Sequence, residues 1–293
     1  MKKLIFKGAA TAIVTPMNDD RSINFSKIKE VTENQILNGI NALVVNGTTG
    51  EASTLSADEQ AKNIAAVCEQ SAGRVPIIAG AGSNDTMRAL MLAKQAEELG
   101  ADALLIVTPY YNKTSQNGII SHYTYIADRV DLPIIVYNVP QRTGVNIKPE
   151  TYRELSRHKN IVAAKEASGD IPALIRAIDL CGDELYFYSG NDDIIVPSLS
   201  VGGMGVISVA SNILPRDIAD ICNSCFRGNY KEAAKRQVEL IRLIDALFCD
   251  VNPVPVKTAM NILGMNVGPV RMPLYPMSEN LRAKLSLELK RVL

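Results

Sequence analysis

Eight short apolar runs, separated by helix-forming stretches, constrain the fold of this 293-residue chain more than any other feature. The runs begin 21 to 34 residues apart, which leaves room for one crossover helix between successive runs. Several are apolar at consecutive positions, as are strands of a parallel sheet that is covered on both faces. The runs are residues 9–15, 42–47, 76–82, 103–109, 133–138, 161–167, 184–190 and 205–210. The pattern predicts an α/β fold, a (β/α)8 TIM barrel, with a doubly wound open sheet as the alternative.

After about residue 226 the alternation ends and three helix-like segments follow, at 231–248, 256–264 and 278–293. A minimal barrel does not need these additional residues. We therefore predict a barrel over residues 1–226 and a C-terminal helical extension over residues 227–293. The extension is expected to pack on the barrel or to form an oligomer interface.

Local signals place several helix starts. Ser56 followed three residues later by Glu59 is a capping-box pattern. Asn84 or Asp85 can cap the next helix, and Pro149 suits the first turn of a later one. These signals support the assignment of helices between the apolar runs.

Composition excludes several classes of function. The 31 basic and 31 acidic residues balance and form no long run, so neither a nucleic-acid tract nor a polybasic membrane patch is expected. No run is long enough to span a membrane, and the N-terminal residues are read as a first strand because Lys7 and Pro16 interrupt a signal-peptide pattern. No G-x-G-x-x-G follows any strand, which argues against a dinucleotide site.

The five cysteines, an odd number, fit a reducing compartment, and we expect a cytoplasmic location. Cys222 and Cys225 have a metal-like spacing but lie in a helical pattern without a second pair, whereas a structural zinc site needs four ligands. The two histidines, His122 and His158, are expected at the surface or at helix ends. No metal site is predicted.

Lys165 is the most distinctive candidate for chemistry, because it ends the apolar run IVAAKEA just before a small-residue turn. Desolvation at such a position favours a neutral amine, which can attack a carbonyl and form a Schiff base. A snorkelling lysine, or one paired with Glu166, explains the same pattern. Tyr137 ends the preceding run, on a neighbouring strand of the predicted barrel. Both side chains should face the barrel mouth, where a phenol can pass protons to an amine.

Other polar residues end strands at the same predicted mouth. The turn GTTGE (47–51) offers free backbone N–H groups that could hold a small carboxylate, although an ordinary loop explains it equally well. Arg142 could grip a second carboxylate or could be a solvated loop arginine. Glu166 should point to the opposite face of its strand from Lys165, as a structural ion pair. Asp192 and Asp193 are read as the cap of the next helix.

Six motifs occur together in an order and spacing found in one enzyme family. They are GTTGE (47–51), PYYN (109–112), YNVP-x-RTG (137–144), KEASG (165–169), SGND (189–192) and GVIS (205–208). With them the chain resembles the dihydrodipicolinate synthase family, which belongs to the pyruvate-dependent class I aldolases together with N-acetylneuraminate lyase. The resemblance runs from about residue 5 into the C-terminal helices. It implies a (β/α)8 barrel, three C-terminal helices and usually a homotetramer built as a dimer of dimers, with a dimer as the alternative.

The resemblance also implies roles for single residues. Lys165 would form the Schiff base with pyruvate. Tyr137, Thr49 and Tyr111 would form a proton relay, in which Tyr111 reaches into the site of the partner subunit. Thr48 and Thr49 would bind the pyruvate carboxylate.

In the same scheme Arg142 would hold the carboxylate of L-aspartate 4-semialdehyde, while Gly190 and the carbonyl of Ile207 line the pocket. The implied product is 4-hydroxy-tetrahydrodipicolinate, formed in the first committed step of lysine and diaminopimelate biosynthesis. The implied chemistry needs no metal and no organic cofactor.

Two alternatives were weighed against this activity. Lyases for keto sugar acids, such as N-acetylneuraminate or 2-keto-3-deoxygluconate, resemble the chain at the lysine and tyrosine. They typically lack an arginine at the position of Arg142 and tend to have serine at the position of Thr48. A catalytically silent pyruvate-binding protein on the same barrel would show no turnover with any aldehyde.

Feedback inhibition by lysine is expected to be weak or absent. In inhibited relatives the ligand binds in a cleft formed by positions that match Ala52, Ala57, Gln60, Asn84, Arg88 and Tyr110. Ala57 and Gln60 stand where the inhibited enzymes often have histidines. Arg88 stands where a glutamate would meet the ligand's amine, and an arginine there repels an ammonium group.

Overall fold

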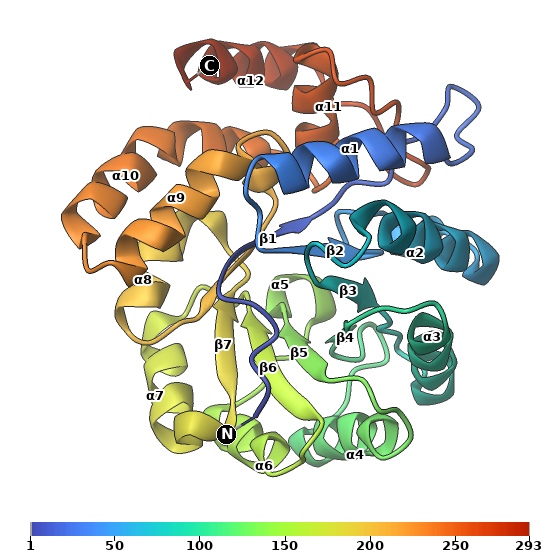
Figure 1. Ribbon diagram of the computed structural model, residues 1–293, viewed down its shortest axis with the longest axis vertical. Coiled ribbons are helices and arrows are strands. Elements are labelled where there is room, and N and C mark those ends of the chain that lie inside the picture. Colours follow the sequence, from blue (N-terminus) through green and yellow to red (C-terminus); the bar gives the residue numbers. More distant parts are fainter. Residues whose placement is uncertain (1, 293) are drawn as a thin grey trace.

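Eight parallel strands close into a barrel in sequence order, with β8 hydrogen-bonded to β1, in the computed structural model, which describes residues 2–292 (Figure 1). This confirms the predicted (β/α)8 barrel. The strands are β1 (Gly8–Ala12), β2 (Ala42–Val45), β3 (Ile77–Gly80), β4 (Ala103–Val107), β5 (Ile134–Asn138), β6 (Ile161–Glu166), β7 (Tyr186–Ser189) and β8 (Gly205–Ser208). Each lies inside one of the eight apolar runs, apart from the first residue of β1.

Helices follow the strands and form the outer ring of the barrel (Figure 1). The helices of residues 2–292 are α1 (Phe25–Leu37), α2 (Ala57–Ser71), α3 (Thr86–Glu98), α4 (Gln116–Ala127), α5 (Pro140–Thr143), α6 (Pro149–Ser156), α7 (Ile171–Cys181), α8 (Ile195–Ser200), α9 (Pro215–Phe226), α10 (Tyr230–Leu247), α11 (Val254–Ile262) and α12 (Glu279–Val292). The short α5 lies inside the ring, and α10 to α12 follow the last barrel helix (Figure 1). Short 3-10 turns occupy Ala52–Thr54, Gly182–Glu184, Asp192–Ile194 and Ala210–Asn212.

The caps read from the sequence are present. The Ser56 hydroxyl accepts from the backbone N–H of Glu59, and the Glu59 carboxylate accepts from the Ser56 N–H, which completes a capping box. Asp85 caps α3 by accepting from the N–H of Met87 at 2.9 Å. Pro149 is the first residue of α6.

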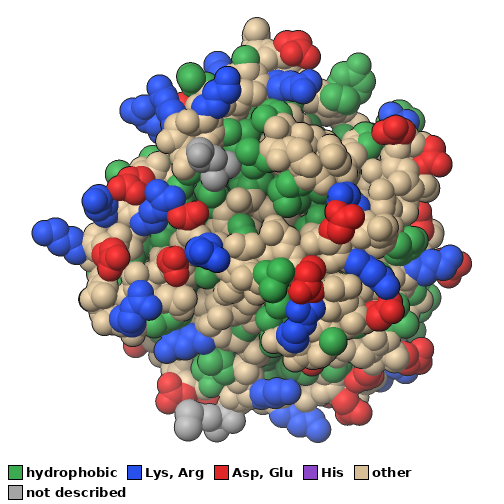
Figure 2. All heavy atoms as spheres, turned by 45° about the horizontal axis from the view of Figure 1, so that its top comes forward, with side chains coloured by type: hydrophobic (Ala, Val, Ile, Leu, Met, Phe, Trp, Pro, Cys, Tyr) green, Lys and Arg blue, Asp and Glu red, His purple; other side chains and the backbone are tan. Residues whose placement is uncertain are grey.

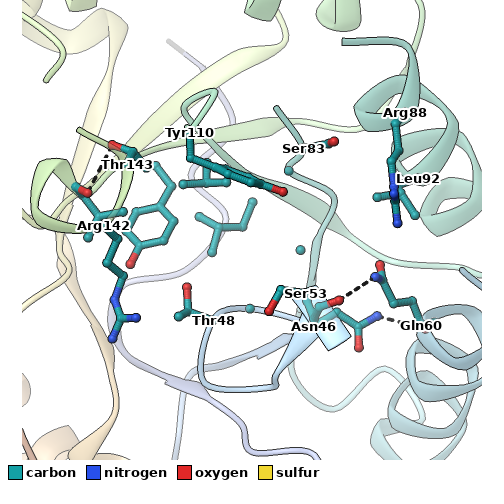
Figure 3. A pocket seen from close by; sticks show the side chains of 18 residues that line it. Asn46, Thr48, Ser53, Gln60, Ser83, Arg88, Leu92, Tyr110, Arg142 and Thr143 are labelled. Atoms are coloured by element: carbon teal, nitrogen blue, oxygen red, sulfur yellow. Dashed lines mark hydrogen bonds between the residues drawn. The ribbon is translucent and has the colours of Figure 1, made fainter. Parts of the chain in front are cut away.

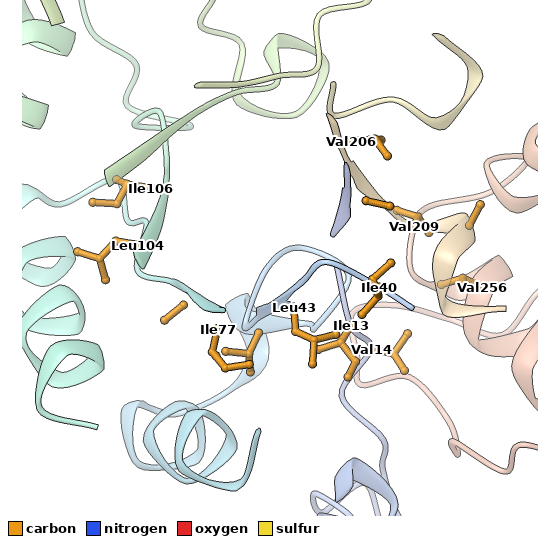
Figure 4. Packing of buried hydrophobic residues seen from close by; sticks show 14 of the residues in the cluster. Ile13, Val14, Ile40, Leu43, Ile77, Leu104, Ile106, Val206, Val209 and Val256 are labelled. Carbon is orange, nitrogen blue, oxygen red and sulfur yellow. The ribbon is translucent and has the colours of Figure 1, made fainter. Parts of the chain in front are cut away.

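Two apolar layers hold the barrel together. A small inner layer fills the barrel and is rich in alanine, with Ala10, Ala42, Ala103 and Ala163 among its members. A larger layer lies between the strands and the surrounding helices; Figure 4 shows part of it, from Leu43 and Ile77 to Val206.

The N-terminal segment closes the opposite end of the barrel. The ring of Phe6 stacks on Tyr188 with centroids 4.1 Å apart, and the Tyr188 hydroxyl donates to the Phe6 carbonyl at 2.7 Å. The Lys2 ammonium donates to the carbonyls of His158 and Ile161 at 2.8 and 2.6 Å. The open end is therefore the one formed by the carboxyl ends of the strands.

The three C-terminal helices lie on one side of the barrel, where α10 packs against α9 and α8, and α12 packs against α10 and α11 (Figure 1). Their apolar residues, among them Leu240, Leu243 and Leu285, belong to the same packed layer as the helices of the barrel. Val256 of α11 lies close to Val209, which follows β8 (Figure 4). The C-terminal helices therefore pack on the barrel, which is the first of the two arrangements expected from the sequence.

Acidic and basic side chains are interspersed on the face shown in Figure 2. Within residues 2–292, no helix has the length and apolar character that a membrane crossing requires.

The expectation for His122 was wrong. Its side chain is 5% exposed on the inner face of α4, and its Nδ1 lies 2.9 Å from the hydroxyl of Thr86. Burial lowers the pKa of His122 to about 4.

Cys222 and Cys225 are buried on α9, and no group of three or more potential metal ligands gathers within residues 2–292.

Candidate active site

Lys165 lies at the carboxyl end of β6 with its side chain directed into the barrel. The residue is 6% exposed and pairs in register with Tyr137 on β5, as the sequence predicted. The lysine Nζ lies 4.3 Å from the centroid of the Tyr137 ring. The amine therefore lies over the face of the ring, and both side chains face the same space.

A cavity of about 160 Å³ opens around this pair. Its lining includes Thr48, Thr49, Tyr137, Arg142, Lys165, Gly190, Asn191, Val209, Phe248 and Asn252. Ligand pockets for drug-sized molecules begin at roughly 300 Å³, so this one suits a smaller molecule. Among the described residues that line it, Lys165 and Arg142 are basic and none is acidic. The cavity therefore favours a small anion.

Gly190 follows β7 and leaves space for the lysine. A Cβ atom at this position would lie 3.0 Å from Cε of Lys165 and 2.5 Å from Cβ of Ala167. Any larger residue would displace the lysine side chain, which explains glycine here on steric grounds.

The loop after β2 brings Thr48 and Thr49 to the cavity. Thr48 is exposed, whereas Thr49 is 2% exposed. The Thr49 hydroxyl accepts from the side-chain amide of Asn252 at 2.9 Å. The hydroxyl of Thr15 donates to the Gly50 carbonyl at 2.7 Å and holds the loop from below.

A buried ion pair fixes the end of this loop. The Lys257 ammonium of α11 donates to Oε1 of Glu51 at 2.8 Å, and Oε2 of Glu51 accepts from the backbone N–H of Arg271 at 2.8 Å. Lys257 also donates to the carbonyls of Thr15 and Pro269. Burial lowers the pKa of Lys257, while the neighbouring Glu51 carboxylate opposes this effect. The pair joins the loop to the C-terminal extension.

Arg142 lies on α5, at the rim of the cavity, with its guanidinium exposed. Its Nη2 donates to the backbone carbonyl of Asn252 at a long 3.5 Å, so most of its donors are free for a ligand. A second cavity of about 390 Å³ continues from this point toward α3. Figure 3 shows Arg142 and Arg88 on opposite sides of it, with Thr48 and Tyr110 between them.

Two of the predicted site residues, Tyr111 and Ile207, do not line the cavity around Lys165. Tyr111 is 89% exposed, in the left-handed backbone region at φ 70°, and its side chain does not line either cavity. Ile207 is fully buried on β8 in the inner layer, next to the lining residues but not among them.

Comparison with known proteins agrees with this geometry. The model of the dihydrodipicolinate synthetase family matches residues 5–292. The chain belongs to the dihydrodipicolinate synthetase family. A 4-hydroxy-tetrahydrodipicolinate synthase of Thermoanaerobacter sp. (strain X514) is 50% identical over 276 residues, covering 94% of this chain and 93% of the relative. One of Caldicellulosiruptor saccharolyticus is 51% identical over 278 residues, covering 95% and 94%.

A solved structure of the family has nearly the same backbone fold as this chain. The chloride-inhibited dihydrodipicolinate synthase of Acinetobacter baumannii, complexed with pyruvate, superposes with a TM-score of 0.96 at 40% identity. The superposed region covers 97% of this chain and 98% of the Acinetobacter baumannii chain. The fold expected from the family resemblance is therefore confirmed.

Two expectations for acidic residues near this family's site were wrong. Glu166 points away from Lys165 as expected, but it pairs with neutral donors rather than a cation: the Asn138 amide, the Tyr152 hydroxyl and the Ser168 N–H. Asp192 does not cap the next helix. Its Oδ2 accepts from the N–H groups of Val209 and Ala210, after β8, and burial raises its pKa. No side-chain bond from Asp193 to that helix start is present either.

Sequence reasoning missed the contribution of the extension to the site. Phe248 and Asn252 lie in the loop between α10 and α11 and line the cavity. Active sites of barrels lie at the carboxyl ends of the strands, and a loop between two helices gives no such signal in the sequence. The extension thus completes the wall of the site.

Proposed function

We propose that the chain is a 4-hydroxy-tetrahydrodipicolinate synthase, a Schiff-base-forming lyase that condenses pyruvate with L-aspartate 4-semialdehyde. The observation that supports this most is the small cavity lined by two basic residues, one a buried lysine beside a tyrosine. Each substrate carries one carboxylate and one carbonyl. The guanidinium of Arg142 can bind a carboxylate, and the amine of Lys165 can attack a carbonyl. The relatives of the same name match nearly the whole chain.

Pyruvate would bind first, with its carboxylate at the loop of Thr48 and Thr49, where backbone N–H groups and hydroxyls can hold an anion. The amine of Lys165 would then attack the ketone carbon, and loss of water gives the imine. Loss of a methyl proton converts the imine to the enamine. The Acinetobacter baumannii relative is described as complexed with pyruvate, in agreement with this assignment.

Arg142 would bind the carboxylate of the semialdehyde at the rim. The enamine carbon attacks the aldehyde carbon, a carbon–carbon bond forms, and the aldehyde oxygen takes up a proton. The amino group of the new chain then displaces Lys165 by transimination, which closes the ring and restores the free lysine. Tyr137, with its ring next to Nζ, would carry the protons of these steps together with Thr49.

The chain would act as a homo-oligomer, a tetramer built as a dimer of dimers. Tyr111 supports this, because an aromatic side chain that is 89% exposed and outside its own cavity is available to a second subunit. Its proposed role is to complete the proton relay in the partner's site.

Five free cysteines fit a reducing, cytoplasmic compartment.

The deciding measurement is condensation of pyruvate with aspartate semialdehyde, coupled to a dihydrodipicolinate reductase and followed by NADPH oxidation. Wild-type protein is expected to turn over, and Lys165→Ala to lose nearly all turnover. Borohydride should trap pyruvate on the wild-type chain but not on Lys165→Ala. Trapping without condensation would instead indicate a lyase for a keto sugar acid, and absence of both would contradict aldolase chemistry.

A further inference from the structure

Asn252 of the C-terminal extension holds the hydroxyl of Thr49, a residue of the proposed relay. Its Nδ2 donates to Thr49 Oγ1 at 2.9 Å across a sequence separation of 203 residues. Both side chains are buried, at 6% and 2% exposed, and both line the cavity of Lys165. This contact is therefore part of the wall of the site.

The direction of this hydrogen bond decides what Thr49 can do. A hydroxyl has one proton to donate, and its lone pairs can accept. Because the Asn252 amide donates to Oγ1, the Thr49 proton is left for another acceptor. Thr49 Oγ1 donates to no acceptor among the described residues, so its proton is available to a ligand or to Tyr137 in the cavity.

The amide is retained at a cost. Asn252 Oδ1 is buried and has no hydrogen-bond partner among residues 2–292. A buried unpaired acceptor costs about 1–3 kcal/mol. An unpaired polar group on the wall of the cavity that Lys165 also lines is a candidate for a role in the site.

Two further contacts hold the segment around Asn252, one to α5 and one to the loop after β2. Its backbone carbonyl accepts from Arg142, and the buried Lys257–Glu51 pair lies five residues beyond Asn252 and two residues beyond Thr49. The start of α11 and the loop after β2 are therefore joined at two points. This double attachment keeps the amide in line with the hydroxyl.

We propose that Asn252 is a positioning residue that orients the Thr49 hydroxyl so that its proton points into the active-site cavity. The inference rests on the proposed function, because it assumes that Thr49 handles protons during Schiff-base chemistry. The role is exerted through Thr49 and does not require contact between Asn252 and substrate.

A double-mutant cycle tests this role with the deuterium exchange of the pyruvate methyl group, which needs imine and enamine formation but no aldehyde. Asn252→Leu and Thr49→Val should each slow exchange by about tenfold or more. The double variant should be no slower than Thr49→Val alone, because the amide acts only through the hydroxyl. Effects that multiply, or an Asn252→Leu rate equal to wild type, would overturn the proposal.

Asn261→Leu serves as the matched control, since its amide donates to the Gly268 carbonyl in the same extension, away from the cavity. It should leave exchange unchanged in both backgrounds. Asn252→Asp is a second variant of nearly the same shape, in case Asn252→Leu does not fold. Its carboxylate must accept the Thr49 proton, so exchange at saturating pyruvate should fall more in the wild-type background than in Thr49→Val, where only the added charge acts.

The outcome for wild-type protein separates the two proposals. Wild-type protein that neither traps pyruvate nor exchanges its protons would overturn both the function and the role of Asn252. Exchange by wild type with no effect of Asn252→Leu or Asn252→Asp would overturn the role of Asn252 alone.

Discussion

Arg142 is the residue that separates the two carboxylate-binding roles of the proposed site. Arg142→Ala is expected to keep pyruvate trapping by borohydride, because Lys165 and the Thr48–Thr49 loop are unchanged. The KM for aspartate semialdehyde should rise about 10- to 100-fold, the equivalent of a charge-assisted hydrogen bond of about 1.5–3 kcal/mol. Steady-state kinetics with each substrate varied in turn measures this. Loss of trapping with an unchanged aldehyde step would reverse the two assignments.

Arg88 bears on regulation. It lines the larger cavity together with Gln60 and Tyr110, on the side opposite Arg142 (Figure 3). A lysine molecule placed there would bring its ammonium close to a guanidinium, and no acidic residue is among the described lining residues to offset the repulsion. Titration of activity with lysine should therefore show weak or no inhibition. Strong inhibition at sub-millimolar lysine would contradict this interpretation of the cavity.

At the scale of elements, the buried Lys257–Glu51 pair joins α11 to the loop after β2, with both side chains at most 2% exposed. Lys257→Met leaves the Glu51 carboxylate buried without its cation and should lower the free energy of unfolding by about 3–5 kcal/mol. Denaturant unfolding measures the loss. Adding Glu51→Gln to Lys257→Met should recover part of it, whereas two additive losses would mean that the pair does not act as a unit.

A second ion pair joins α2 to the segment before α12 and gives a pH dependence. Arg271 donates to both carboxylate oxygens of Glu59 and lowers the pKa of Glu59 to about 2, from 4.5. Because the folded pKa is depressed, this stabilisation is present above pH 4.5 and is lost as pH falls toward 2.

Solvent screening limits the contribution of this partly exposed pair to about 1 kcal/mol. Glu59→Gln retains an acceptor for the capping box but cannot ionise. Thermal unfolding between pH 5 and 2 should therefore be less pH-dependent in Glu59→Gln than in wild type. Equal slopes would rule out a contribution from Glu59.

Sequence patterns predicted the barrel well and the extension's part in the site not at all. Strand positions follow from apolar runs because burial on both faces leaves a direct trace in composition. The pairing of Lys165 with Tyr137 follows from alternation along two neighbouring strands. The contact of Asn252 with Thr49 depends on how α10 and α11 pack against the barrel, and no local pattern encodes it.

Buried polar residues show the same limit. Glu166 and Asp192 were assigned a salt bridge and a helix cap, which are the usual local roles of acidic residues. The structure instead buries both and satisfies them with neutral donors from other elements. Such partners are fixed by tertiary packing, so the sequence shows the acid without showing what it bonds.

At the scale of the whole molecule, the isolated chain brings three proposed relay and Schiff-base residues to one cavity, but not Tyr111. Tyr111 lies on the loop after β4 and is 89% exposed, although an aromatic ring in water contributes nothing to the fold of its own subunit. The division into a barrel and an extension at residue 226 and the tetramer both stay predictions. Because Tyr111 lies outside the cavity of its own chain, a site that two subunits build together can be tested through this residue.

Subunit complementation tests whether Tyr111 acts in the partner's site. Tyr111→Phe should slow turnover, because the phenolic proton path is lost while the ring is kept, and Lys165→Ala should be inactive. If each site takes its lysine from one chain and this tyrosine from the other, mixed dimers of the two variants contain one intact site. Co-refolded mixtures should then exceed the summed activity of the separate variants, in proportion to the hybrid dimers formed. Tyr111 acting within its own chain would give no gain, since every site would then lack either the lysine or the phenol.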